Sequence, residues 1–284
     1  IDTLFVEPTL LNSPQRSLKE DDILSYSIED ILKSNQNFIL YGLKESGKTI
    51  LLDKMFIELT RKYNQYLKIP VLLKFNDLFK HDSKKAVREF LSISSNEIDG
   101  FLKQNDILLL IDDFQFDEKY LDQIKDLKDF LSDYDRVRLI ITKDQILENV
   151  IPTDYLPHND VFNFNIVFIQ NFNSSQIRQL IIKWFNGREV DLQENMQKLM
   201  KSFVDFGLQR TPLTITMFLW IFEKQEKRPI NNSVLVEMFI ENLLEKTNIE
   251  NIYSETFDFK NKQRLLSFIA MYMSENGDCD RSYS

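Results

Sequence analysis

The chain has 284 residues, of which 43% are hydrophobic, so a sizeable core is available for one large domain or for two to three smaller ones. Its formal net charge of −9 argues against a general polyanion-binding surface, and its single cysteine excludes an internal disulfide and a cysteine-based zinc site. No run reaches the roughly 18 apolar residues of a membrane span and no signal sequence opens the chain, so we expect a cytoplasmic protein without membrane contact.

Residues 1–35 are expected to form an N-terminal linker and one helix. Pro8 and Pro14 indicate irregular structure over residues 1–17. Apolar residues at helical spacing then predict a helix over residues 18–32 (Leu24, Ile28, Ile31 and Leu32). This helix would precede the first strand of the next domain.

The strongest motif follows an apolar run at residues 38–41 and leads into a helical pattern. It is a complete G-x-x-x-x-G-K-T phosphate-binding loop, and strand, loop and helix are the context that this Walker A motif requires. Lys48 would reach the β- and γ-phosphates of a nucleotide, and Thr49 would bind Mg²⁺. A glycine turn that binds nothing is the alternative. The predicted nucleotide contacts are Gly42, Leu43, Lys44, Glu45, Ser46, Gly47, Lys48, Thr49 and Ile50.

Short apolar segments after the loop predict four more strands, over residues 69–75, 106–111, 137–142 and 161–169. Helical patterns separate them, at residues 83–91, 97–103 and 117–131. Alternating strands and helices favour parallel pairing with right-handed crossovers. We therefore expect an α/β P-loop nucleotide-binding domain over residues 36–170, with a parallel five-stranded sheet and helices on both faces.

Only helical patterns follow residue 170, at 177–185, 192–203, 213–222, 234–244 and 265–273. We expect a helical domain over residues 171–228 and a further helical segment over residues 229–284. Asn173 or Ser174 would cap the first of these helices.

A second nucleotide motif lies about 60 residues after the loop, where an apolar strand ends in Asp112 and Asp113. Asp112 would hold a water of the metal, so Thr49 and Asp112 are the predicted metal site. Asp113 would orient or deprotonate the attacking water, which makes Lys48, Asp112 and Asp113 the predicted catalytic residues. A solvated Asp pair at a strand end is the alternative. Thr142 or Lys143, at the end of the next strand, would sense the γ-phosphate, or the pair would simply be an ordinary strand end.

The order of these features resembles the NACHT branch of the STAND ATPases, signalling relatives of the AAA+ ATPases. The resemblance rests on four segments: Gly42–Thr49, Leu108–Asp113, Ile140–Lys143 and Phe206–Leu213. It implies that Pro212 packs near the adenine, although a proline in the first turn of a helix is also ordinary. It also implies that residues 229–284 lead into a winged-helix domain that is truncated here.

The resemblance implies a switch that binds ATP or ADP with Mg²⁺, self-associates on activation, and works with sensor and effector domains outside this segment. Its setting would be anti-phage defence in a bacterium or innate immunity in an animal. The chain departs from the family pattern at Gln115 and Phe116, where acidic residues are common, and at Lys143 and Asp144, where Arg often occurs. We therefore expect slow hydrolysis.

Three other functions stay open. An AAA+ ATPase that remodels protein or nucleic acid would need brisk hydrolysis, and the pair Asp112-Asp113 lacks its usual second-position Glu. A P-loop kinase would need a lid and clustered arginines, for which Arg136 and Arg138 are the candidates. A scaffold with a vestigial site is the last alternative.

Overall fold

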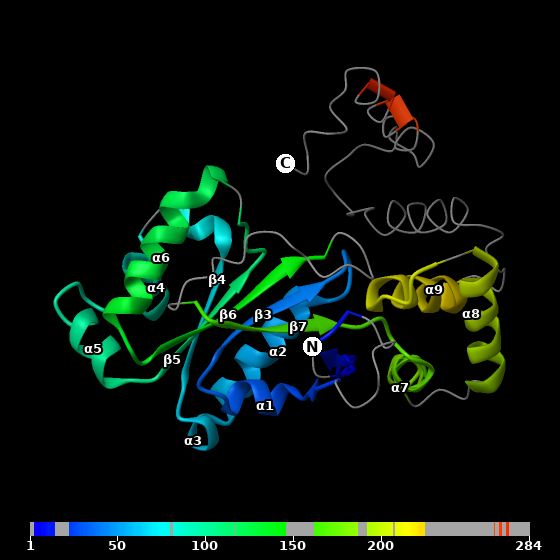
Figure 1. Ribbon diagram of the computed structural model, residues 1–284. Helices are drawn as coiled ribbons and strands as arrows, with labels where there is room; N and C mark the ends of the chain where they lie inside the picture. The colour runs from blue at the N-terminus through cyan, green and yellow to red at the C-terminus, as the bar shows by residue number, and fades with distance from the viewer. Residues whose placement is uncertain are drawn as a thin grey trace, which may run out of the picture. The chain divides into compact units, whose positions relative to one another are not determined.

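A computed structural model describes residues 3–14, 23–79, 82–116, 118–145, 162–186, 192–206 and 208–224, with a few positions between 264 and 272. The strands form one seven-stranded sheet with the order β2-β1-β7-β3-β6-β5-β4 (Figure 1). Its strands are β1 (Leu10–Leu11), β2 (Ser25–Tyr26), β3 (Asn37–Gly42), β4 (Ile69–Lys74), β5 (Ile107–Asp112), β6 (Val137–Asp144) and β7 (Phe164–Ile169).

The five longer strands, β7, β3, β6, β5 and β4, pair in parallel and are the five that the sequence predicts. The prediction of five strands is nevertheless too low, because β1 and β2 add an antiparallel edge beside β7. Leu10 pairs with Tyr26 on one side and with Ile169 on the other. Each edge strand is only two residues long, which is too short to produce a visible alternation of apolar and polar residues.

The helix before the first long strand is shorter than predicted. Helix α1 spans Ile28–Lys33, after strand β2 and not from residue 18 onward. Ser27 begins the helix, because its hydroxyl accepts a hydrogen bond from the Asp30 N–H while the Asp30 carboxylate accepts one from the Ser27 N–H. Leu24 is exposed and does not share the buried face of Ile28 and Ile31. Residues 15–22 lie outside the described residues.

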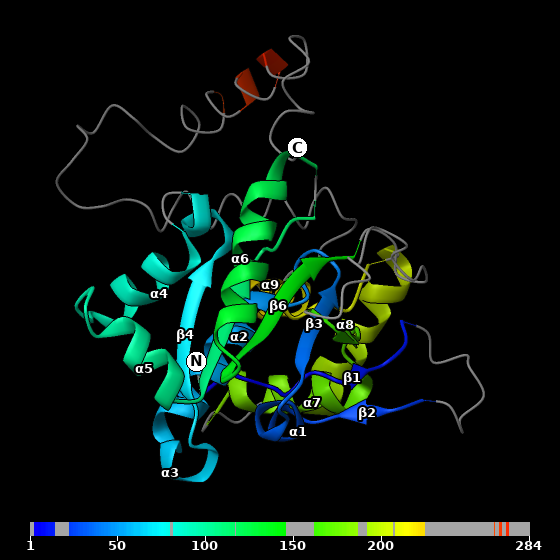
Figure 2. The ribbon, with the colours of Figure 1, turned by 60° about the vertical axis from the view of Figure 1, so that its left-hand side comes forward.

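Helices cover both faces of the parallel strands, as predicted. On one face lie α1, α2 (Lys48–Arg61) and α3 (Tyr63–Tyr66); on the other lie α4 (Ser83–Leu91), α5 (Ile98–Gln104) and α6 (Leu121–Asp133), visible together in Figure 2. Two short 3₁₀ helices lie between strands and helices: η2 (Phe75–Phe79) between β4 and α4, and η3 (Glu118–Tyr120) between β5 and α6. Because η3 takes the start of the predicted helix at 117–131, α6 begins at residue 121.

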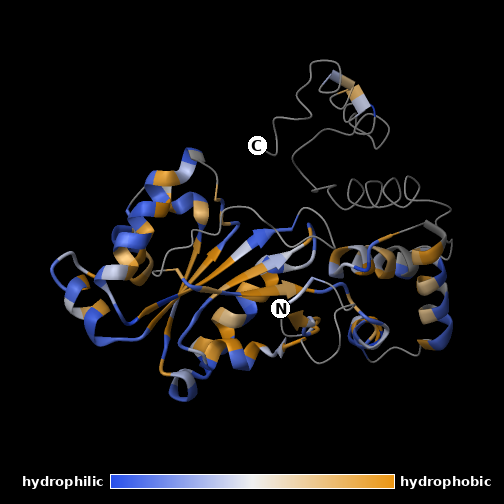
Figure 3. Ribbon diagram, viewed as in Figure 1, coloured by the Kyte–Doolittle hydropathy of each residue, from blue (hydrophilic) through white to orange (hydrophobic). Residues whose placement is uncertain are grey.

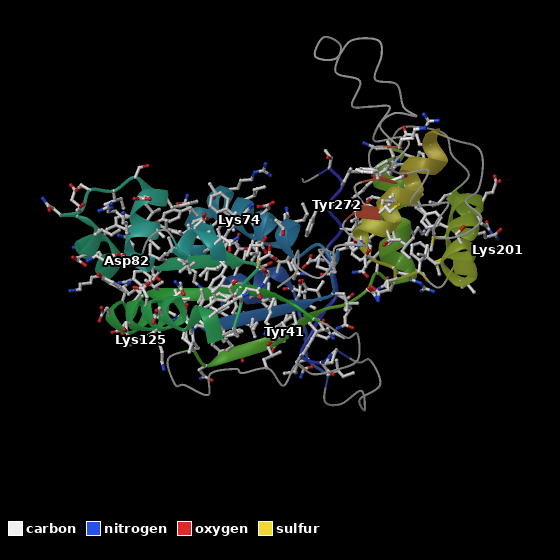
Figure 4. All side chains as sticks on the ribbon, turned by 90° about the horizontal axis from the view of Figure 1, so that it is seen from above. Tyr41, Lys74, Asp82, Lys125, Lys201 and Tyr272 are labelled. Atoms are coloured by element: carbon white, nitrogen blue, oxygen red, sulfur yellow. The ribbon has the colours of Figure 1, made fainter. Side chains whose placement is uncertain are left out.

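Side chains alternate between the two faces of the sheet, so each strand contributes to two cores. In β3, Phe38 and Leu40 pack with α1 and α2, whereas Ile39 and Tyr41 pack with α4, α5 and α6. The Tyr41 ring, labelled in Figure 4, stacks on Phe168 with the ring centroids 5.5 Å apart. Figure 3 shows the consequence: the strands are largely hydrophobic, and the helices carry their hydrophilic residues outward.

Helices α7 (Ser174–Trp184), α8 (Leu192–Phe206) and α9 (Pro212–Lys224) follow the sheet. Asn173 caps α7, as predicted, since its side chain accepts a hydrogen bond from the Gln176 N–H. The chain forms two compact units, Ile1–Lys198 with Gln209–Ile215, and Leu199–Leu208 with Thr216–Ser284. The domain boundaries after residues 170 and 228 stay a prediction. The helix predicted at 234–244, most of that at 265–273 and the expected winged-helix start lie outside the described residues.

None of the helices in the described part of the chain is long and apolar enough to span a membrane.

Candidate functional site

The predicted site residues meet at the carboxyl ends of three neighbouring strands. The phosphate loop follows β3, Asp112 ends β5, and Thr142 lies near the end of β6, which stands between β3 and β5. In parallel sheets, ligands bind outside the carboxyl ends of the strands. The order of the strands thus brings together residues that are about 60 and 90 positions apart in the sequence.

The loop has the backbone that its glycines require. Gly47 is the N-cap of α2 with a φ of 88°, a left-handed conformation that costs glycine little. A Cβ on Gly42 would lie 2.3 Å from Ser46 Oγ and 3.1 Å from Lys48 Cγ, so any other residue here would force the Ser46 and Lys48 side chains to move. No side chain caps α2, and the first N–H groups of a helix have no acceptor within the helix, which makes them suitable donors for an anion.

One buried hydroxyl in the loop supports a phosphate ligand. The Ser46 side chain is buried, and its Oγ has no hydrogen-bond partner among the described residues. A buried polar atom without a partner destabilises the fold by about 1–3 kcal/mol. A phosphate oxygen next to the loop would remove this cost, so the residues present fit the nucleotide that the motif implies.

The Lys48 side chain folds back over the loop. It is only 8% exposed, and its Nζ donates to the carbonyl oxygens of Leu43 at 3.1 Å and Gly42 at 3.3 Å. The same Nζ lies 2.6 Å from Oδ1 of Asp144, the last residue of β6. The cation that would bind phosphate is therefore held at the loop by two carbonyls and one carboxylate.

Asp112 links the loop helix to the sheet. Its carboxylate is buried and accepts hydrogen bonds from Thr49 Oγ1 at 2.6 Å and from Thr142 Oγ1 at 2.5 Å. Mg²⁺ in nucleotide sites commonly takes one or two protein oxygens and fills its shell with phosphates and water. One buried carboxylate beside one threonine hydroxyl is a suitable donor set for such an ion.

Thr142 is fully buried, and both functions of its hydroxyl are used. It donates to Asp112 and accepts a hydrogen bond from the Asp113 N–H at 3.0 Å. The Phe114 N–H donates to the Thr142 carbonyl at 2.9 Å. Thr142 thereby orients the Asp112 carboxylate and holds the backbone of Asp113, and its contact with a γ-phosphate stays a prediction.

Asp113 has a left-handed backbone conformation and a carboxyl group whose pKa is raised. Its φ of 55° lies in the left-handed region, where non-glycine residues are strained and often functional. Burial raises the pKa of the Asp113 carboxyl above its ordinary value, and the charges of Asp112 and Asp144 raise it further. A carboxylate with a raised pKa is a better general base, which suits the role predicted for Asp113.

A pocket of about 420 Å³ opens beside Asp112 and Thr49. Leu52, Leu72 and Leu73 form its apolar part, and its charged lining is Asp53, Lys74, Asp77 and Asp112. Lys74 ends β4 and is labelled in Figure 4. Burial, and then the charge of Asp112, raise the pKa of the Asp53 carboxyl. Sequence patterns do not reveal this pocket, because its residues come from four elements, α2, β4, η2 and β5, and form no motif.

Pro212 lies close to the loop, although 165 positions separate it from Gly47 in the sequence. A Cβ on Gly47 would lie 3.6 Å from Pro212 Cγ. Thr211 is buried and accepts a hydrogen bond from the Thr214 N–H at 3.2 Å, which caps the first turn of α9. The structure thus brings Pro212 to the site, and its contact with adenine stays a prediction.

The remaining predicted contacts follow from the loop. Leu43 is buried, whereas Lys44, Glu45 and Ile50 are exposed around the loop. Asp144 is the most important residue that the sequence did not single out as part of the site. One feature of the sequence could have indicated its role: Asp144 follows Thr142 by two residues, just after the end of the predicted strand.

The departures from the family pattern also have a structural reason. Phe116 packs on Phe114, with the ring centroids 4.8 Å apart, and Lys143 Nζ lies 5.1 Å from the centroid of the Phe116 ring. Gln115 Nε2 donates to the Asp113 carbonyl at 3.3 Å. An aromatic cluster and an amide stand where the family commonly carries acidic residues.

No protein-family model and no curated protein matches the chain. Similar solved structures include AMPPCP-bound DnaA from Aquifex aeolicus, with 20% identity and a TM-score of 0.47 over 87% of this chain and 75% of that one. Domain III of the Thermotoga maritima replication initiation protein DnaA has 13% identity and a TM-score of 0.43 over 74% and 85%. The Aeropyrum pernix ORC2 protein has 10% identity and a TM-score of 0.47. The match spans 72% of this chain and 62% of the ORC2 chain. Likeness at this level assigns no activity, so function has to be inferred from the site.

Proposed function

We propose that the chain binds ATP and ADP with Mg²⁺ at the Gly42–Thr49 loop and acts as a nucleotide-dependent switch of the NACHT type. The observation that carries the proposal is the joining of Thr49, Asp112 and Thr142 by hydrogen bonds of 2.6 and 2.5 Å, next to the buried Lys48. A glycine turn without a ligand needs neither a buried lysine nor a buried carboxylate. Both groups are costly to bury, and the contacts that offset the cost hold Lys48 and Asp112 at the loop, where phosphate and Mg²⁺ would bind.

Each residue has a role that its position supports. Lys48 and the first turn of α2 would bind the β- and γ-phosphates. Thr49 and Asp112 would hold Mg²⁺, which supplies neutralisation of phosphate charge when bound. Asp113 would orient the attacking water and accept its proton. Because Gln115 and Phe116 replace the acidic residues of the family, we expect hydrolysis to be slow.

A slow ATPase suits a switch, in which the bound nucleotide and not the rate of turnover is the signal. Pro212, at the start of α9, is close enough to the loop to respond to its ligand. For a switch, ATP and ADP must bind two conformations with different affinity. The proposal includes self-association after activation, sensor and effector domains elsewhere, and a role in anti-phage defence or innate immunity.

A remodelling ATPase of the AAA+ type is the second candidate, because the same buried carboxylate and threonine would serve it. Multiple turnovers per second would favour it over the switch. A kinase fits less well. Arg136 pairs with Asp106 at 2.9 Å, and Arg138 donates to the Asn35 carbonyl at 2.7 Å. Both arginines lie at the start of β6, at the opposite end of the strand from Asp144.

The test is to purify the protein, denature it, and identify the released nucleotide by chromatography. A switch that holds its product is expected to release nearly one ADP per chain. Lys48→Ala should release none, whereas Lys125→Ala, which removes an exposed lysine from α6 (labelled in Figure 4), should match the wild type. A folded wild-type protein that releases no nucleotide and fails to bind added ATP or ADP would contradict the proposal.

A further inference from the structure

Lys48, whose ammonium group would bind phosphate, forms an ion pair with Asp144. An ammonium group has three N–H donors. The Lys48 Nζ has three acceptors nearby: the Leu43 carbonyl at 3.1 Å, the Gly42 carbonyl at 3.3 Å and Asp144 Oδ1 at 2.6 Å. A phosphate oxygen can therefore bind Lys48 only by displacing one of these acceptors.

Of the three acceptors of Lys48, the Asp144 carboxylate is the one that a phosphate displaces most easily. The two carbonyls belong to the loop itself, and the Gly42 carbonyl also accepts from the Gln145 N–H at 2.9 Å. The Asp144 side chain is 62% exposed, so water replaces Lys48 around its carboxylate when the ion pair opens. Binding of nucleotide is thus a competition between phosphate and the Asp144 carboxylate for one ammonium.

The displaced carboxylate stays near the site, because its backbone is fixed. Asp144 pairs with Gly42 in the parallel register of β3 and β6. Any phosphate bound to Lys48 consequently faces a negative charge at the end of β6. Asp112 and Asp113, at the end of β5, add two more carboxylates to the same end of the sheet.

The repulsion from Asp144 grows with the charge of the ligand. A triphosphate brings one more charged phosphate than a diphosphate to the end of the chain that Lys48 binds. Mg²⁺ neutralises part of this charge. We propose that Asp144 sets the preference of this site between nucleoside diphosphate and nucleoside triphosphate, favouring the diphosphate. The inference rests on the proposed nucleotide site and names the residue that biases its resting state.

The experiment measures the dissociation constants of ADP and of the triphosphate analogue AMPPCP, with Mg²⁺, by calorimetry on the 284-residue chain. Asp144→Asn removes the charge and keeps the size of the side chain, and Asp144→Glu keeps the charge. Asp106→Asn is the matched control, because Asp106 is 44% exposed and also pairs with a cation, Arg136, at 2.9 Å. It lies directly before β5, at the other end of the strand from Asp112.

Asp144→Asn is expected to tighten binding of AMPPCP about threefold to tenfold, and of ADP by a smaller factor, since the Asp144 carboxylate is largely exposed to water, which weakens its ion pair with Lys48. Asp144→Glu and Asp106→Asn should keep the wild-type ratio of the two constants. An equal change for ADP and AMPPCP, the same change in Asp106→Asn, or weaker binding of AMPPCP would overturn the inference. If all folded variants and the wild type bind neither ligand, the proposed function itself fails, and the inference with it.

Discussion

Thr49 Oγ1 donates a hydrogen bond of 2.6 Å to Oδ2 of Asp112, although 63 positions separate the two residues in the sequence. Thr49 is in the first turn of α2 and Asp112 ends β5, so this bond joins the phosphate loop to the carboxylate strand across the intervening β6. The other oxygen, Oδ1, accepts from Thr142. Two hydroxyls thus fix the orientation of the buried carboxylate before any cation binds, which is the preorganisation that a metal site needs.

Asp112→Ala tests the metal role of this carboxylate. We expect nucleotide affinity to fall more in the presence of Mg²⁺ than in EDTA, because only the Mg²⁺-dependent part of binding uses Asp112. The variant leaves two hydroxyls without their acceptor, so its free energy of unfolding should also fall, by about 1–3 kcal/mol. Calorimetric titration with and without Mg²⁺ measures the first effect. Equal losses in the two conditions would remove Asp112 from the metal shell.

Lys48→Ala should abolish nucleotide binding without unfolding the protein. Removing a hydrogen-bonded charge from a binding site costs about 2 kcal/mol or more, which is an affinity loss of about 30-fold or more. The loss of stability should be small, because the Asp144 carboxylate left behind is exposed to water. Equilibrium binding of a fluorescent ATP analogue and urea unfolding measure the two quantities. Wild-type affinity in the variant would refute the loop as the binding site.

The longer elements could be predicted from the sequence, because they leave a strong local pattern. The five parallel strands are runs of apolar residues between helical patterns, and each was predicted to within a few residues of its observed bounds. Strands β1 and β2 could not be predicted. Leu10 and Tyr26 are held there by pairing with distant residues, and two residues carry no periodicity. Ser27 was a local signal for the true start of α1, and the apolar spacing around Leu24 hid it.

The residues of the site that belong to local motifs can be predicted from the sequence. Those that reach the site through the pairing register of the strands cannot. Gly42, Lys48, Thr49 and Asp112 follow from two local patterns. The contact of Asp144 with Lys48 exists because β6 pairs with β3 so that residue 144 stands opposite Gly42. The sequence alone does not determine this register. The pocket beside Asp112 likewise needs the order of the strands, which places β4 beside β5.

The two glycines Gly47 and Gly100 should respond in opposite ways to substitution by alanine. Gly47→Ala forces a left-handed φ of 88° on an alanine, so we expect a loss of stability of about 1 kcal/mol and weaker nucleotide binding. Gly100 lies in α5, where an added Cβ meets nothing within 4 Å. Gly100→Ala should stabilise the protein by up to about 1 kcal/mol and leave binding unchanged. Urea unfolding of both variants checks the signs, and a stable Gly47→Ala protein with normal affinity would contradict the loop geometry.

The raised pKa of Asp113 predicts a stability that depends on pH. A carboxyl whose pKa is higher in the folded state contributes stability below its unfolded value near 3.8, and this contribution is lost as the pH rises through the folded-state pKa. Asp113→Asn removes the charge and suits the left-handed backbone. We expect its melting temperature to exceed that of the wild type by more at pH 7 than at pH 3.5.

Asp99→Asn is the control with the opposite sign. Hydrogen bonds from Lys84 and Tyr134 lower the pKa of the Asp99 carboxyl, so its contribution is present above about pH 3.8 and is lost as the pH falls through the lower folded-state value. This variant should be less stable than the wild type at pH 7, and the difference should shrink in acid. Parallel pH profiles for the two variants would show that the charges around Asp113 do not repel as inferred.

Thr142→Val should show whether the buried hydroxyl orients the Asp112 carboxylate and the Asp113 backbone. Valine has nearly the shape of threonine, so the change removes the bond to Asp112 at 2.5 Å and the bond from the Asp113 N–H at 3.0 Å with little change in packing. We expect a loss of about 1–3 kcal/mol in the free energy of unfolding, because two buried polar groups lose their partner. Hydrolysis should slow further, since the Asp113 backbone N–H loses the acceptor that positions this residue. Thr142→Ser keeps the hydroxyl and should retain most of the activity, whereas equal rates for the Val variant and the wild type would assign Thr142 a packing role only.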